Sequence, residues 1–147
     1  QLGLAGKLSA WTKTDRGLVA LVVLLDQFSR NIHRGTAQAF CGDPLALALA
    51  QESIASGRHL RVPVIHRVFL YLPLEHSEDL ALQDKCVALY EELAKVSDNP
   101  QFASFTRYAA AHRDVIAQFG RFPHRNAALG RTSSVDEISY LEQHRGF

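Results

Sequence analysis

The feature that most constrains the fold is the run from Leu18 to Leu25, in which every side chain is apolar. The run lies in a helical pattern that starts near Arg16, and we expect Asp15 to cap that helix. A helix that is apolar on every side must be surrounded by other elements. Asp26 ends the run well short of the ~20 apolar residues that a bilayer span needs. The pattern therefore predicts a central buried helix and no membrane-spanning segment.

Helical spacing of apolar residues recurs along the rest of the chain, and no segment alternates strictly between apolar and polar residues. Proline, serine, aspartate and glycine at expected helix ends set the boundaries. We expect helices over residues 16–25, 44–56, 63–72, 78–94, 100–119 and 135–143. Asp43 and Ser77 are the expected caps of two of them, and Ser134 with Glu137 forms a capping box. Short connections then predict an all-α fold, a compact antiparallel array of roughly six to seven helices.

Length and composition narrow the class of protein. A chain of 147 residues with 47% hydrophobic and 21% charged residues fits one globular domain over 1–147. The formal net charge of +1 argues against a non-specific nucleic-acid binder. We expect Cys41 and Cys86 to be reduced, mostly buried thiols of a cytoplasmic protein. Because the chain begins at Gln1, contains no methionine and opens on a helix-like stretch, we also expect an N-terminal segment to be missing.

Three stretches hold the densest polar chemistry: Asp26–Thr36, Leu74–Glu78 and Gly120–Asn126. Each lies where a helix is expected to begin or end, and loops and helix ends can direct side chains into a common cleft. Two of the three stretches lie largely in parts of the chain that lack Asp and Glu but contain Arg and His, so their local fields favour small anions. The sequence therefore predicts one shared site built from all three.

The first stretch offers an anion-binding face. If the central helix continues past Leu25, the side chains of Gln27, Arg30, Asn31 and Arg34 fall within about 100° of arc. The planar guanidinium of arginine binds phosphate or carboxylate with two parallel hydrogen bonds. The alternative is structural: Asp26 pairs with Arg30 one turn later, and the other residues cap neighbouring helix ends.

The third stretch gives a second anion-binding candidate in Arg121, Arg125 and Asn126. A short helix starting at Pro123 would direct its first backbone amides toward the anion that these arginines attract. The alternative is a surface turn with solvated arginines.

Glu75 and His76 are candidates for general acid–base chemistry, because histidine titrates near neutrality and a neighbouring carboxylate orients it. His124 is a further candidate. The alternative is a capped, acid-rich helix start, which accounts for Ser77 and Glu78. The His and Glu side chains near His76, together with His124, could supply metal ligands, but no HExxH or Cys-rich spacing supports such a site, so no metal site is predicted. We expect His112, on the apolar stripe of its helix, to be a core residue.

The same three stretches carry a family resemblance. They read Leu24-Leu25-Asp26-Gln27-Phe28-Ser29-Arg30-Asn31 with Arg34-Gly35-Thr36-Ala37 and Ala39-Phe40, then Tyr71-Leu72-Pro73-Leu74-Glu75-His76-Ser77-Glu78, then Phe119-Gly120-Arg121-Phe122-Pro123-His124-Arg125-Asn126 and Leu129-Gly130-Arg131. This text resembles the bacterial family catalogued as domain of unknown function 924. The resemblance covers nearly the whole chain and implies a tetratricopeptide-like helical fold preceded by a segment rich in Trp and Phe. It implies no reaction and no cofactor.

Three hypotheses of function follow. The first is a pocket that binds a small anionic ligand, a phosphate or carboxylate compound, through the residues Arg30, Arg34, Arg121 and Arg125, oriented by Gln27, Asn31 and Asn126. The second is an enzyme in which His76 or His124 moves a proton and Glu75 orients it. The third is a helical scaffold that binds a protein or peptide partner.

Overall fold

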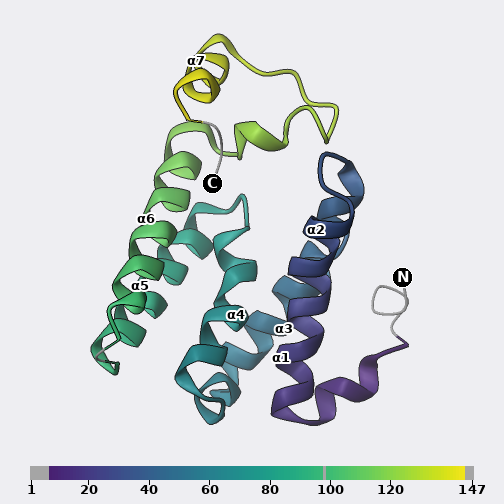
Figure 1. Cartoon of the computed structure of the whole chain (residues 1–147), viewed down its shortest axis with the longest axis vertical. Coiled ribbons are helices and arrows are strands. Elements are labelled where there is room, and N and C mark those ends of the chain that lie inside the picture. The colour runs from purple at the N-terminus through teal and green to yellow at the C-terminus, as the bar shows by residue number, and fades with distance from the viewer. Residues whose placement is uncertain (1–6, 98, 145–147) are drawn as a thin grey trace.

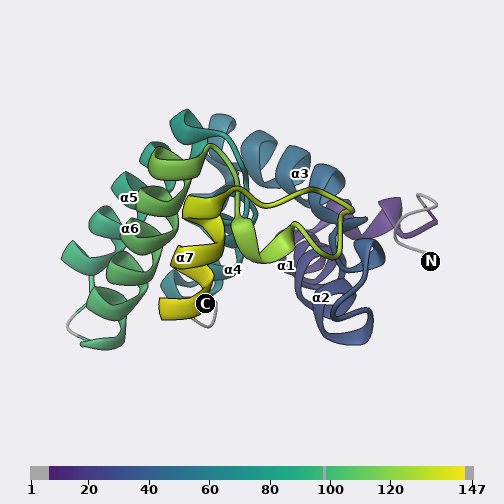
Figure 2. The ribbon, with the colours of Figure 1, turned by 90° about the horizontal axis from the view of Figure 1, so that it is seen from above.

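The computed structural model describes residues 7–97 and 99–144, which form helices and turns without any strand in those ranges. The α-helical segments are α1 (Asp15–Val23), α2 (Ser29–Ile32), α3 (Asp43–Ala55), α4 (Val64–Glu75), α5 (Leu80–Lys95), α6 (Gln101–Phe119) and α7 (Val135–Gln143). The prediction of an all-α fold is therefore confirmed. Figures 1 and 2 show α5 and α6 side by side at one end of a curved array, with α1 and α2 at the other and α4 between them. A tetratricopeptide-like arrangement stays a prediction.

The central helix is longer than α1 alone. A π-helical turn over Leu24–Phe28 connects α1 directly to α2. Leu21, Val22 and Leu25 are buried against the neighbouring helices, as the apolar run predicts. A π turn inserts one extra residue per turn and so redirects the side chains that follow it. This turn contains Asp26, the first polar residue after the run.

Local capping differs from the prediction at the start of α1. The hydroxyl of Thr14, not the carboxylate of Asp15, accepts the backbone N–H of Gly17 at 3.1 Å. Asp15 instead accepts hydrogen bonds from Arg58 at 2.6 Å and from Arg61 at 3.0 Å. Asp15 therefore pairs with two arginines from a distant segment and does not cap the helix, although its local sequence predicts that it would.

Helix α4 does not end near Tyr71 and Pro73, which corrects the predicted boundary. It continues through Pro73 to Glu75, and His76 is its C-cap. Proline has no backbone N–H and removes one bond of the helix ladder. Pro73, Leu74 and Glu75 are all buried, so packing of the last turn holds the helical path. Glu75 and His76 are consequently carried on a helix end deep in the molecule.

Two more predicted caps are wrong. Asp79, not Ser77, caps α5 by accepting the N–H of Leu82 at 3.1 Å. Gly42 occupies the N-cap position of α3, and Asp43 lies in the first turn without a side-chain capping bond. The capping box of Ser134 and Glu137 at α7 is confirmed.

The main core lies between α1, α3, α4, α5 and α6, and includes Leu18, Leu70 and Tyr90. A smaller cluster of Val115, Ile116 and Phe122 holds the end of α6 to the segment that follows it. In both Figure 1 and Figure 2 that segment, residues 120–134, leaves α6 toward α2 and then returns to α7. It thus covers the C-terminal end of α4.

Two further expectations can be compared with the described residues. None of their helices is long and apolar enough to cross a membrane. Cys86 is buried, but Cys41 is exposed, so the prediction of two buried thiols is wrong for Cys41. Both cysteines are free.

Candidate functional site

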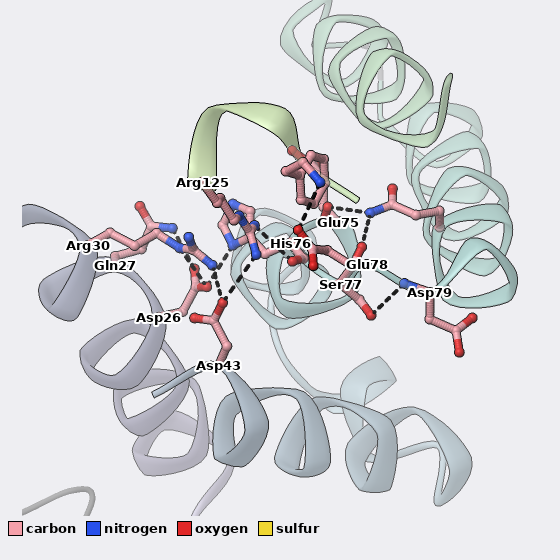
Figure 3. A network of polar contacts seen from close by, with 12 residues as sticks. Asp26, Gln27, Arg30, Asp43, Glu75, His76, Ser77, Glu78, Asp79 and Arg125 are labelled. Atoms are coloured by element: carbon pink, nitrogen blue, oxygen red, sulfur yellow. Dashed lines mark hydrogen bonds and ion pairs between the residues drawn. The ribbon is translucent and has the colours of Figure 1, made fainter. Parts of the chain in front are cut away.

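Polar and charged side chains from four parts of the chain meet at the C-terminal end of α4 (Figure 3). They come from the π turn and α2, the first turn of α3, the end of α4 with the residues after it, and the covering segment 120–134 with the facing side of α6. We name this group the central network: Asp26, Arg30, Asp43, Glu75, His76, Glu78, His112, Arg125 and Arg131. It draws residues from all three predicted stretches but takes only part of each: Asp26 and Arg30 from the first, Glu75, His76 and Glu78 from the second, and Arg125 from the third.

Asp26 is the hub of one half of the network. Its carboxylate is 1% exposed and accepts hydrogen bonds from His76 Nδ1 at 2.6 Å and from Arg30 Nε at 3.3 Å. Gln27 Nε2 donates to its other oxygen at 2.6 Å. Burial on its own would raise the pKa of Asp26, but the hydrogen bond from His76 and the charge of Arg30 lower it to about 2. Asp26 is therefore a fixed negative charge.

His76 is held by Asp26 in an orientation that suits proton transfer or ligation. Burial lowers the pKa of His76, against the opposing influence of the Asp26 carboxylate. The neutral imidazole then donates from Nδ1, and Nε2 carries the lone pair. The predicted orienter was Glu75; the contact at 2.6 Å instead comes from Asp26, 50 positions earlier in the chain.

Arg30 connects Asp26 to the start of α3. Its Nη2 donates to Asp43 Oδ2 at 2.8 Å, and Arg125 Nη1 lies 3.7 Å from the same oxygen. Both guanidinium groups lie over the ring of Phe40, with Cζ to centroid distances of 5.3 Å for Arg30 and 4.9 Å for Arg125. Burial raises the pKa of Asp43 despite the nearby charge of Arg30.

Arg125 is the most buried arginine of the network, at 6% exposure. Its Nη2 donates to the backbone oxygen of His76 at 2.9 Å, and its Cζ lies 4.4 Å from the Phe122 ring centroid. Its Nε is buried without a hydrogen-bond partner among the described residues. Burial lowers the pKa of Arg125 to about 10, so it stays protonated at neutral pH.

Glu78 ties the covering segment to the end of α4. Its carboxylate accepts two hydrogen bonds from the Arg131 guanidinium, at 2.7 and 2.9 Å, and the backbone N–H of Phe122 at 2.8 Å. Burial opposes ionisation, but these donors together lower the pKa of Glu78. Glu78 therefore positions the covering segment rather than complementing the dipole of α5.

Glu75 and His112 form the other, more buried half. Glu75 Oε1 lies 3.4 Å from His112 Nδ1, which also contacts the backbone oxygen of Tyr108 at 2.8 Å. Burial, with a further contribution from the charge of Asp26, raises the pKa of Glu75 to about 7. Burial lowers the pKa of His112 to about 4. His112 is buried as predicted, but it borders this carboxylate and is not surrounded only by apolar groups.

Glu75, His76 and His112 could also hold a metal ion. One donor atom from each lies within 4.8 Å of the donor atoms of the other two. The sequence shows no metal-binding spacing because His112 is far from the other two along the chain. Only the packing of α6 against α4 brings the three together.

Arg121 and Asn126 lie outside the central network. Arg121 donates to both carboxylate oxygens of Glu137, at 2.6 and 2.8 Å, and to the backbone oxygen of Thr132 at 2.9 Å. Asn126 is buried and donates to Ser133 Oγ at 3.0 Å. We name Arg121, Asn126, Thr132, Ser133, Ser134 and Glu137 the C-terminal cap region. The structure thus separates Arg121 from Arg125.

The remaining candidates are near the protein surface. Arg34 lies beyond the end of α2 and is exposed, so the prediction that it shares a helix face with Arg30 is wrong. Asn31 is exposed and donates to the backbone oxygen of Gln27 at 2.9 Å. His124 is exposed, with its ring 5.5 Å from that of Phe122. The three-residue turn Pro123–Arg125 is too short for the predicted helix.

Sequence reasoning did not identify Asp43, Glu78 and Arg131 as site residues. The first two were assigned to local helix ends, where acidic residues are common. The resemblance motif contains Arg131 but gives it no partner. A pairing between Glu78 and Arg131 has no local signature, because the two are 53 positions apart.

Comparison with known proteins identifies the family. The family described as "Bacterial protein of unknown function (DUF924)" matches residues 2–145, and the chain belongs to it. A solved structure of a protein of unknown function from Agrobacterium tumefaciens is 38% identical, with a TM-score of 0.85. The match covers 97% of this chain and 76% of that one. No curated protein matches the chain significantly.

Proposed function

We propose that the central network binds a small anionic molecule, with Arg125 as the main anion-binding residue. The observation that carries the proposal is the buried Nε of Arg125, which has no hydrogen-bond partner in the described part of the chain. A buried donor without a partner costs about 1–3 kcal/mol, and more when the group is charged. An anionic oxygen at this position would remove that cost.

The neighbouring groups support the same ligand. Arg131 Nε is a second buried donor without a partner, and Asp43 Oδ1 is a buried acceptor without one in the described chain. Asp43 Oδ2 lies 3.7 Å from Arg125 Nη1, so one small molecule could contact both side chains. The two donors favour an anionic oxygen, and the acceptor favours a hydroxyl. A hydroxylated carboxylate or a phosphate with a nearby hydroxyl meets these requirements.

Four side chains of the network are partly exposed to solvent. The side chains of Arg30, Asp43, Arg131 and Glu78 are 19%, 23%, 24% and 27% exposed. Arg125 is more deeply buried and lies between the aromatic rings of Phe40 and Phe122. A ligand that entered past the partly exposed residues would meet Arg125 at a buried position against two aromatic rings, where exclusion of water strengthens a charged hydrogen bond.

The test is thermal unfolding of the metal-free protein with inorganic phosphate, malate or succinate. A ligand at ~100 times its dissociation constant adds about 2.7 kcal/mol to stability, or several degrees in Tm. We expect a shift with at least one of these anions, and a larger one with malate than with succinate because only malate carries a hydroxyl group for Asp43.

Two matched arginine variants decide whether the central network is responsible. Arg125→Met should abolish the shift, whereas Arg121→Met, in the same segment but outside the network, should retain it. Absence of a shift with all three anions, or a shift that survives Arg125→Met unchanged, would reject the proposal.

A further inference from the structure

We propose that Glu75, His76 and His112 form a binding site for a divalent metal ion, with Zn²⁺ as the ion that best matches the donor set. This site goes beyond the anion site, because it uses different residues on the α6 side of the network. Two imidazoles and one carboxylate are a common protein ligand set for zinc. Imidazole and carboxylate also bind other first-row divalent ions, whereas Mg²⁺ and Ca²⁺ prefer oxygen donors.

The first argument is geometric. One donor atom of each residue lies within 4.8 Å of the other two. Metal–ligand bonds of about 2.0–2.2 Å place neighbouring donors roughly 3.0–3.5 Å apart. Small side-chain rotations that move each donor atom by about an ångström would therefore bring the three donors to a common ion. Two of the residues lie on consecutive positions at the end of α4, and the third lies on the facing side of α6.

The second argument is the charge of Glu75. It is 6% exposed, and its side chain lies against the imidazole of His112 at 3.4 Å and against Tyr90, neither of which is a permanent cation. Burying an ionised carboxylate without a cation is costly, so such groups are protonated, paired or bound to a metal. A divalent ion would supply the cation that the surrounding residues do not.

The third argument concerns the groups behind the ligands. Metal-binding histidines usually donate their other ring N–H to a carboxylate or a backbone carbonyl. His76 Nδ1 donates to Asp26 at 2.6 Å, and His112 Nδ1 contacts the Tyr108 carbonyl at 2.8 Å. Both rings are thus held by the kind of partner that orients a metal ligand.

Nearby positive charges are the opposing effect. Arg30 and Arg125 lie on the Asp26 and Asp43 side of His76, and these two carboxylates pair with them. The positive charge of the two arginines is therefore partly offset by these carboxylates before a metal ion binds. The carboxylate of Glu75 contributes negative charge on the α6 side.

The experiment is equilibrium dialysis of untagged, chelator-treated protein against Zn²⁺. We expect about one Zn²⁺ per chain, and affinity at least ~10-fold weaker in Glu75→Gln and in His112→Gln. His59→Gln is the matched control, because His59 is also buried but contacts Tyr71 on another part of α4. Cys41→Ser controls for binding by the exposed thiol. Both controls should bind Zn²⁺ as the wild type does.

Absence of stoichiometric binding, binding lost in Cys41→Ser, or equal affinity in both ligand variants would each overturn the proposal. If the two ligand variants fail to fold, X-ray absorption of zinc bound to the wild type decides. A spectrum of two imidazoles with oxygen donors supports the site, and any other donor set overturns it. Arg125→Met should still bind Zn²⁺, so failure of the anion site and failure of the metal site are distinguishable.

Discussion

Arg121 and Arg125 belong to one short segment and the same predicted motif, yet their surroundings differ. In the C-terminal cap region, Arg121 pairs with Glu137 through two hydrogen bonds and donates a third to Thr132. In the central network, Arg125 is more buried but has one backbone hydrogen bond, one loose ion pair and an unpartnered Nε within the described chain. The difference between these two arginines in hydrogen bonding is the basis on which we propose a ligand site at Arg125 and a structural role for Arg121.

The largest expected effect comes from removing the hub of the central network. Asp26→Ala leaves Arg30 and His76 without their buried carboxylate, and breaking a buried pair in this way costs about 3–5 kcal/mol. Urea unfolding measures the change in the free energy of unfolding. Asp84→Ala, which breaks the exposed pair of Asp84 with Arg113, is the control and should cost far less, because exposed ion pairs contribute little to stability. Similar losses in the two variants would contradict the assignment of Asp26 as hub.

Gly42→Ala disturbs the central network without altering any of its side chains. A Cβ at Gly42 would lie 2.1 Å from the backbone oxygen of Leu25, next to Asp26, so backbone must move. Such overpacking typically costs about 1–3 kcal/mol. At Gly120, which has a φ of 68° and nothing within 4 Å of an added Cβ, alanine carries only the strain of that conformation, roughly 1 kcal/mol. Thermal unfolding of both variants measures their losses of stability. A smaller loss for Gly42→Ala than for Gly120→Ala would contradict the prediction.

The two arginines should respond differently to the same substitution. Arg121→Met leaves the carboxylate of Glu137, which is 2% exposed, with the Ser134 N–H but without its arginine partner, and we expect a larger loss of stability than for Arg125→Met. Arg125→Met removes an incompletely paired charge and places an apolar chain between Phe40 and Phe122, so the loss should stay below about 1.5 kcal/mol. Chemical unfolding of the two variants measures both values. A larger loss for Arg125→Met would mean that its role is mainly structural.

The smallest expected effect is the contribution of Glu137, in the C-terminal cap region, to the pH dependence of stability. The hydrogen bonds from Arg121 lower the pKa of Glu137 to about 2. Because the folded pKa lies below the unfolded value, the ionised carboxylate stabilises the fold above pH ~4.5 and this contribution is lost toward pH 2. The Tm difference between wild type and Glu137→Gln should therefore shrink as pH falls through that range. Asp136→Asn, an exposed position in the same helix, is the control, and a constant difference for Glu137→Gln would contradict the pairing.

Much of the fold could be predicted from the sequence because its signals are local. The apolar run Leu18–Leu25, the capping box at Ser134 and the stripe of α6 all depend on residues within one or two turns. Several predicted ends were wrong where tertiary contacts prevailed. Asp15 and Asp43 pair with distant arginines, and α4 continues through Pro73 because its last turn is buried.

The sequence by itself determined an all-helical protein and the three stretches in which its polar residues gather. Only the tertiary structure decided that Asp26 orients His76, that Glu78 holds Arg131, and that Arg121 belongs to another region than Arg125. The physical reason is the distance along the chain between the residues that interact. Helical periodicity and capping are set by neighbours three or four residues apart. The partner of a buried charge is whichever opposite charge the packing of separate helices brings within hydrogen-bonding distance.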